Sequence, residues 1–215
     1  YRFIMMKLAS YIVSLLVVVF SACTPQTDVG LETALSASGD NRPELEKVLH
    51  HYKDSTLKLQ AAEFLIENMF HYSLVDGETV FDIRNITADY LIRNIDSSFR
   101  SWSASPWKDE VDFDTFCRFV LPYRVSDEPL SSWRDSLRTE YMHLVKDETH
   151  ACEAFAKVYV FLLDRFLKLN DDVLPSPDVM SLHHMQRGTC AHRSIYVVSV
   201  LRSLGIPAAY DCIPF

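Results

Sequence analysis

The segment around Cys190 holds the residues of this sequence that are best suited to chemistry. Cys190 follows Gly188 and Thr189, and a run with helical spacing begins at the same point. Threonine is a favoured N-cap residue, and the free amide groups and dipole at the start of a helix favour a thiolate. We therefore predict that Cys190 is a catalytic nucleophile at a helix N-terminus. The alternative is a small apolar residue packed near a helix end.

The elements that must position Cys190 follow directly in the chain. Apolar residues recur at helical spacing over 195–204 and stop at Gly205, a residue type typical of the position just after a helix. Residues 208–213 then have the pattern of a strand, which Pro214 ends. A single core strand needs neighbouring strands. Because the sequence stops at Phe215, we expect an incomplete C-terminus.

Two sequence blocks in this region resemble the nucleophile region of the transglutaminase-like superfamily. They are GTCAHRS at 188–194 and LRSLGIPA at 201–208. The resemblance implies a papain-like α+β fold, with Cys190 on a central helix against an antiparallel sheet. It also implies a reaction through a cysteine thioester on a peptide, protein or glycan substrate, without a cofactor. The helical part before it is similar to envelope lipoproteins of Bacteroidetes type.

The chain departs from the family pattern after the cysteine. In that family a histidine and an acid follow the nucleophile on strands, whereas here only His192 and Asp211 follow. His192 lies two positions along the same helix and therefore on a different face. The triad cannot be completed from these residues, so the sequence as it stands predicts an inactive fragment. Two alternatives remain: a non-catalytic lipoprotein that binds a peptide or glycan with the same fold, and a purely structural helical lipoprotein.

The N-terminus has the features of an export signal. Arg2 and Lys7 precede an apolar run at 8–20, which is too short to span a bilayer and ends in small residues before Cys23. This pattern resembles a lipobox. It predicts a signal peptide at 1–22 and lipid attachment at Cys23, which would anchor the protein to a membrane of the bacterial cell envelope. An ordinary signal, in which Cys23 is incidental, is the alternative.

Composition and spacing divide the rest of the chain. The net charge of −8 argues against a nucleic-acid partner. Residues 23–42 are polar and predict a tether, 43–169 predict a helical region, 170–187 a linker, and 188–215 the start of the transglutaminase-like core. The expected fold class is α+β and predominantly helical.

Further candidate residues lie outside the Cys190 segment. Tyr123, Arg124 and Trp133 fall in a non-helical stretch and could form the wall of a substrate cleft; ordinary loop packing is the alternative. The histidines near Cys190 have no standard metal-site spacing, so we expect no metal. Cys117 and Cys152 fall in helical stripes and are expected in the core.

Overall fold

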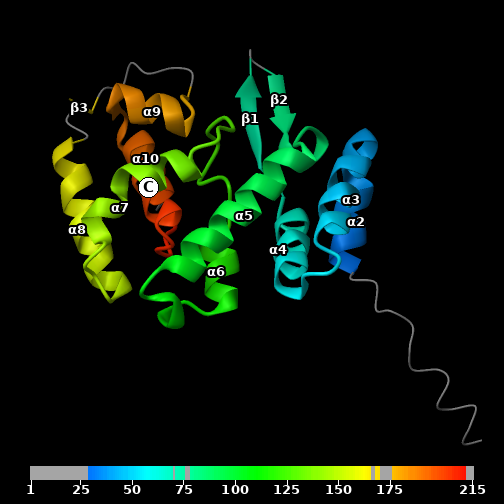
Figure 1. Ribbon diagram of the computed structural model, residues 1–215. Coiled ribbons are helices and arrows are strands. Elements are labelled where there is room, and N and C mark those ends of the chain that lie inside the picture. The colour runs from blue at the N-terminus through cyan, green and yellow to red at the C-terminus, as the bar shows by residue number, and fades with distance from the viewer. Residues whose placement is uncertain (1–28, 70, 76–77, 166–167, 170–175, 212–215) are drawn as a thin grey trace, which may run out of the picture.

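The structure, a computed structural model, describes residues 29–69, 71–75, 78–165, 168–169 and 176–211. Its longer elements are, in chain order, α2 (Val29–Ala37), α3 (Arg42–His51), α4 (Thr56–Glu67), β1 (Tyr72–Val75), β2 (Glu78–Phe81), α5 (Ala88–Ala104), α6 (Phe113–Phe119), α7 (Arg134–Val145), α8 (Ala151–Arg165), β3 (Lys168–Leu169), α9 (Val179–Met185), β4 (Arg187–Gly188) and α10 (Cys190–Ser203) (Figure 1). Short 3-10 turns lie at Gly39–Asn41, Asp82–Arg84 and Lys108–Glu110. The expected fold class, α+β and predominantly helical, is therefore confirmed at this coarse level.

The helices form where apolar residues recur every three or four positions. The run expected at 195–204 corresponds to α10, and the helical region expected at 43–169 contains α4, α5 and α8 and nearly all of α3. In α5 the stripe buries Leu91 and Ile95, and the Thr87 side chain accepts a hydrogen bond from the amide of Tyr90 at the helix start. The sequence pattern thus located these elements correctly.

Three expected segments differ from the structure. The tether expected through residue 42 is wrong over 29–41, where α2 and a 3-10 turn bury Ala34 and Leu35. The linker expected at 170–187 contains α9 and β4, and Asp178 caps α9 by accepting from two backbone amides. The strand expected at 208–213 is not formed over Ala208–Asp211; residues 212–213 lie outside the described part. The helices α2 and α9 are short and have polar flanks, so their apolar residues are too few to give a clear stripe in the sequence.

Two small sheets complete the fold. β1 and β2 form an antiparallel hairpin in which Tyr72 pairs with Phe81 and Val75 with Glu78. β3 and β4 form a parallel pair, with Leu169 opposite Gly188. The second pair therefore fixes the backbone immediately before Cys190.

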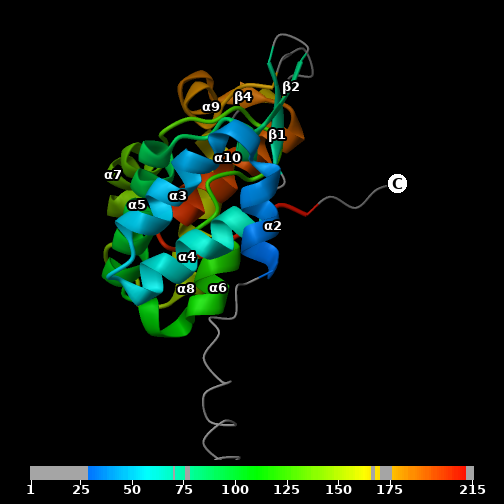
Figure 2. The ribbon, with the colours of Figure 1, turned by 90° about the vertical axis from the view of Figure 1, so that its right-hand side faces the viewer.

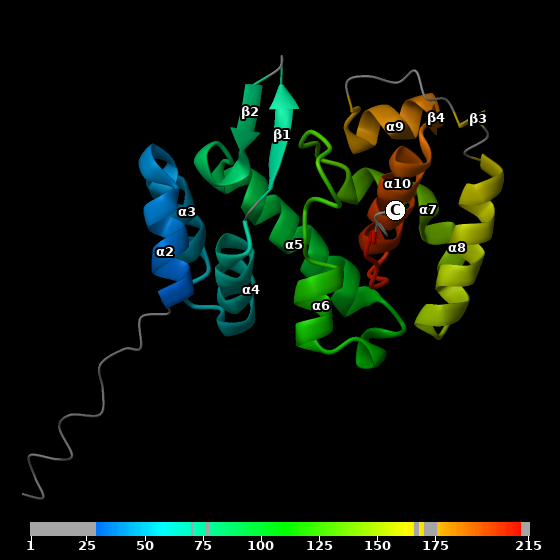
Figure 3. The same cartoon turned by 180° about the vertical axis from the view of Figure 1, so that it is seen from behind.

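α10 lies at the centre of the helical assembly. It packs against α5, α7, α8 and α9. Viewed from the side, α3 and α4 lie in front of it (Figure 2). From behind, α8 and α2 lie at opposite edges of the molecule (Figure 3). Within the part of the chain that the structure describes, no helix is both long enough and apolar enough to cross a membrane.

Candidate functional site

Cys190 is the first residue of α10, and its side chain is exposed and free. The Thr189 hydroxyl accepts a hydrogen bond from the amide of His192 at 3.2 Å. In return, Nδ1 of His192 accepts from the amide of Thr189 at 3.2 Å. This reciprocal arrangement is a capping box, which satisfies two of the amides that a helix start leaves open. The predicted helix N-terminus, with Thr189 as its cap, is confirmed.

His192 is used by this cap. Its Nδ1 accepts from a backbone amide, so the ring proton resides on Nε2, which lies 3.5 Å from the Ser176 hydroxyl. Burial lowers the pKa of His192, although the charge of Asp127 opposes the effect. The imidazole is therefore a neutral structural element of the helix start, and its accepting nitrogen is turned to the backbone instead of to the Cys190 thiol.

Gly188 makes room for this histidine. A Cβ added at Gly188 would lie 2.9 Å from both Cβ and Nδ1 of His192. Any larger residue would push the imidazole out of the capping box. Glycine is thus required at position 188, because the His192 side chain approaches it so closely.

The far end of α10 is fixed to the core. Gly205 adopts φ +78°, and the amides of Gly205 and Ile206 donate to the carbonyls of Arg202 and Leu201, the Schellman arrangement. The Trp107 indole donates to the Gly205 carbonyl at 3.0 Å. The expected helix stop at Gly205 is confirmed, and the nucleophile candidate sits on a helix held at both ends.

An open groove of about 450 Å³ begins one turn beyond Cys190. Arg193 and Ser194 of α10 lie at its edge, and the Ser194 hydroxyl donates to the Cys190 carbonyl at 3.1 Å. Phe155 and Tyr159 of α8 form another wall; their rings stack with centroids 5.5 Å apart, and both side chains are exposed. Exposed aromatic surface of this kind is typical of a binding surface.

The three residues expected in a substrate cleft lie apart from Cys190. Tyr123, Arg124 and Trp133 are all buried, and the Trp133 indole donates to the Tyr123 carbonyl at 3.3 Å. The carbonyl of Arg124 accepts from the guanidinium of Arg202 at 2.5 Å. Arg202 follows Cys190 by more than three helical turns, about 18 Å along the axis. These residues therefore pack near the other end of α10.

Two buried arginines hold this loop in place. Arg134 donates to the carbonyls of Val120, Leu121 and Pro122, at 2.7, 2.9 and 2.8 Å, and also to the side chain of Asn94. Burial lowers its pKa to about 9, and the pKa of Arg202 to about 10. Both guanidinium groups remain charged at neutral pH, and carbonyl oxygens solvate them in place of water.

Arg124 has a different partner. Its Nε and Nη2 donate to the two carboxylate oxygens of Asp82, both at 2.6 Å, and both side chains are almost fully buried. Glu128 accepts from the amides of Val125 and Ser126 at 2.8 Å, which closes the turn after Arg124. A buried ion pair and these hydrogen bonds therefore hold the loop in its position.

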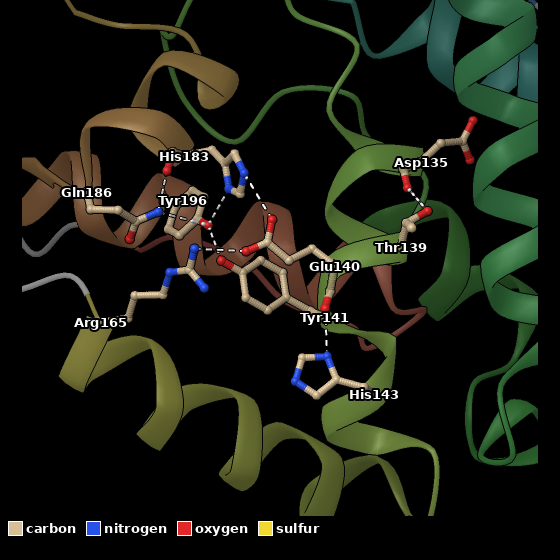
Figure 4. A network of polar contacts seen from close by, with 9 residues as sticks. All are labelled: Asp135, Thr139, Glu140, Tyr141, His143, Arg165, His183, Gln186 and Tyr196. Carbon is tan, nitrogen blue, oxygen red and sulfur yellow. Dashed lines mark hydrogen bonds and ion pairs between the residues drawn. The ribbon is translucent and has the colours of Figure 1, made fainter.

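A second polar cluster, which the sequence did not reveal, joins α7, α8, α9 and α10 (Figure 4). His183 donates from Nε2 to Glu140 at 3.1 Å and accepts at Nδ1 from the Tyr196 hydroxyl at 2.9 Å. The Tyr141 hydroxyl lies 2.6 Å from that of Tyr196, and Arg165 pairs with Glu140 at 2.9 Å. Burial lowers the pKa of His183, so the ring is neutral. Because Tyr196 and Tyr141 are fully buried, this cluster ties helices together.

The other cysteines separate into two kinds. Cys117 is buried, as expected, and burial raises the pKa of its thiol to about 12. Cys152 is exposed on the first turn of α8, so its expected core position is wrong. Cys23 lies outside the described residues. Among the described residues, no group of three or more His, Cys, Asp or Glu side chains is placed to hold a metal ion.

Comparison with protein-family models, with curated proteins and with solved structures finds no match to this chain. The resemblance around Cys190 therefore rests on its two sequence motifs. The geometry of α10 is structural information that does not depend on that resemblance.

Proposed function

We propose that the protein is a membrane-anchored, transglutaminase-like thiol enzyme with Cys190 as the nucleophile. The observation that carries this proposal is the exposed thiol on the first residue of a capped helix, one turn before the first residues of α10 that line an open groove. A helix start is an environment that activates cysteine.

The proposed reaction is acyl transfer through a thioester. The Cys190 sulfur attacks the carbonyl carbon of a carboxamide or peptide, the C–N bond breaks, and the amine leaves with a proton. Water or a second amine then attacks the thioester and releases the thiol, giving hydrolysis or transfer. Hydrolysis suits a bacterial envelope protein better, since water is the abundant acceptor there.

The reaction also needs a general base and acid. His192 does not fill this role, because its Nδ1 accepts from the Thr189 amide and its pKa is lowered. The resemblance implies that a histidine and an acid follow on strands after the nucleophile helix. The proposal therefore requires that the natural protein continues beyond Phe215. DNA sequence past that codon tests this directly: a continuing frame with a histidine and a later Asp or Asn supports the enzyme, and an immediate stop counts against it.

The reactivity of Cys190 can be tested against a matched control in the same molecule. Cys152 is also exposed and also lies in the first turn of a helix, but Glu153 follows it, whereas Arg193 lies one turn after Cys190. Iodoacetamide labelling of the full chain, followed by peptide mass analysis, should modify Cys190 faster than Cys152 at neutral pH. Equal rates at the two thiols would remove the support for an activated nucleophile.

A non-catalytic role in binding a peptide or glycan is the second candidate. The exposed, stacked pair of Phe155 and Tyr159 in the groove favours it, because aromatic faces bind both kinds of ligand. If Phe155→Ala weakens binding of a peptide or oligosaccharide and Cys190→Ser leaves it unchanged, this role is supported over catalysis.

We further propose that Cys23 carries the lipid that holds the protein to a membrane of the cell envelope. The basic start, the short apolar run and the small residues before Cys23 support this. Mass analysis should find acyl mass on Cys23, and Cys23→Ala should release the protein from the membrane fraction. Retention of that variant on the membrane would contradict the anchor.

A further inference from the structure

The open groove of about 450 Å³ lies on the face of α10 that begins with Cys190. Five residues of this helix line it: Arg193, Ser194, Val197, Val198 and Leu201. They follow Cys190 by three, four, seven, eight and eleven positions, which is the spacing of one helix face. The exposed Cys190 thiol therefore stands at one end of the row of side chains that forms this wall.

α8 forms a second wall and runs in roughly the opposite direction to α10. β3 follows the C-terminal end of α8 and pairs with β4, which ends two positions before Cys190. The C-terminal end of α8 consequently lies toward the start of α10 (Figure 1). Leu163, Tyr159 and Phe155 therefore line the groove at increasing distance from Cys190, and all three side chains are exposed.

Arg193 puts a positive charge at the Cys190 end of the groove. Residues three positions apart on a helix have Cβ atoms about 5–6 Å from each other, and helical side chains lean toward the helix N-terminus. The guanidinium therefore extends along the first turn of α10, toward Cys190. The Arg193 side chain has no ion-pair or hydrogen-bond partner among the described residues, so they leave its charge available to a ligand.

Asp211 is the one acid among the described residues that line the groove. It lies in the segment at 207–211, is exposed, and forms no ion pair with Arg193. The groove thus has a cation near Cys190, an anion on another wall, and aromatic and aliphatic surface farther along. This pattern fits a ligand that is acidic near the thiol and apolar farther from it.

We propose that the groove selects an acyl donor with a carboxylate close to the reacting carbonyl and an aromatic or large apolar side chain farther along, as in an acidic, aromatic peptide. The carboxylate accepts from Arg193, which makes this arginine a specificity-determining residue, and the apolar side chain lies against Tyr159. The volume falls within the roughly 300–1,000 Å³ of ligand sites, which gives room for a short peptide segment. This substrate class rests on the proposed function of Cys190.

Protection of Cys190 from alkylation by iodoacetamide tests this specificity in the full chain. The probes are the peptide N-acetyl-Glu-Gly-Trp-amide and its neutral analogue with Gln in place of Glu. We expect saturable protection by the acidic peptide in the millimolar range. The neutral peptide should bind about two- to fivefold more weakly, which is the effect of one solvent-exposed ion pair. Tyr159→Ala should weaken both peptides alike, because it removes aromatic surface that they share.

Arg193→Gln should remove the difference between the two peptides, and its unpaired, half-buried position makes the variant compatible with the fold. Arg187→Gln is the matched control, because it removes an exposed arginine near Cys190 in the chain that does not line the groove. It should preserve the difference. Equal protection by both peptides, no protection, a preference that survives Arg193→Gln, or a preference lost in Arg187→Gln would overturn the proposal.

These outcomes are separate from the test of the nucleophile itself. Alkylation needs only a reactive thiol, so the peptides can fail to protect Cys190 while it still labels faster than Cys152. That result would reject the substrate class and leave the proposed nucleophile standing. Equal labelling rates of the two cysteines without peptide would instead count against the nucleophile.

Discussion

Asp82→Asn tests how much the buried ion pair with Arg124 contributes to stability, because it removes one charge from a pair that water does not reach. Asp82 and Arg124 have side-chain exposures of 2% and 1%, and both bonds between them measure 2.6 Å. The substitution keeps the size of the side chain and leaves the Arg124 guanidinium buried without a counter-charge. Breaking a buried pair in this way costs about 3–5 kcal/mol.

That cost is a large part of the total stability of a domain, which is about 5–15 kcal/mol. With a urea m-value of about 2 kcal/mol/M, the unfolding midpoint should fall by about 1.5–2.5 M. Urea unfolding followed by far-UV circular dichroism measures this shift. The exposed pair of Asp114 and Arg118 is the matched control, because Asp114→Asn should cost less than about 1 kcal/mol.

A double variant separates the charge from the packing. Asp82→Leu combined with Arg124→Met removes both charges and should recover much of the loss, because apolar residues often replace buried pairs with little cost. A loss below about 1 kcal/mol in Asp82→Asn, or a double variant less stable than the single one, would refute this reasoning about a desolvated pair.

Three further substitutions address α10. Gly205→Ala should lower the free energy of unfolding in urea by about 2 kcal/mol or more, because the backbone at Gly205 is left-handed and the new Cβ would lie 2.8 Å from the Ser101 carbonyl oxygen. A decrease of less than about 0.5 kcal/mol would contradict this. Thr189→Ala should lower the free energy of unfolding by about 1 kcal/mol and slow the alkylation of Cys190, because it removes the helix cap. An unchanged stability and an unchanged alkylation rate would show that the cap has no effect. Because the pKa of His192 is lowered, the unfolded chain binds the extra proton and stability falls as pH drops through about 6.5. His192→Gln keeps a capping residue and should reduce that acid loss in pH-dependent unfolding; identical losses would contradict it.

The parts of this structure that the sequence predicts are those controlled by nearby residues. The helical spacing of 195–204 located α10, and Thr189 and Gly205 marked its two ends, because caps act within a few residues of themselves. The same local rules failed at 29–41, where Ala34 and Leu35 are too few to give a clear stripe but still reach the core.

Other features depend on residues far apart in the chain. Asp82 and Arg124 are separated by 42 positions, and His183 reaches Tyr196 only because α9 folds back on α10. No periodic pattern encodes such contacts. The complete burial of Arg124 and Trp133 could not be predicted for the same reason, since arginine is mostly exposed, tryptophan is rarely buried completely, and their loop is not periodic.

The central position of α10 also has a consequence for biosynthesis. Each described helix that packs against α10 precedes it in the chain, so α5 and α7 leave the ribosome before the helix that covers them exists. Arg134 then lacks its contact with the Arg202 carbonyl, and Ser101 lacks the Ser203 carbonyl to which it donates at 2.7 Å. The nascent chain must keep its apolar surfaces exposed until α10 emerges, which makes a chaperone holding the unfinished chain valuable during synthesis.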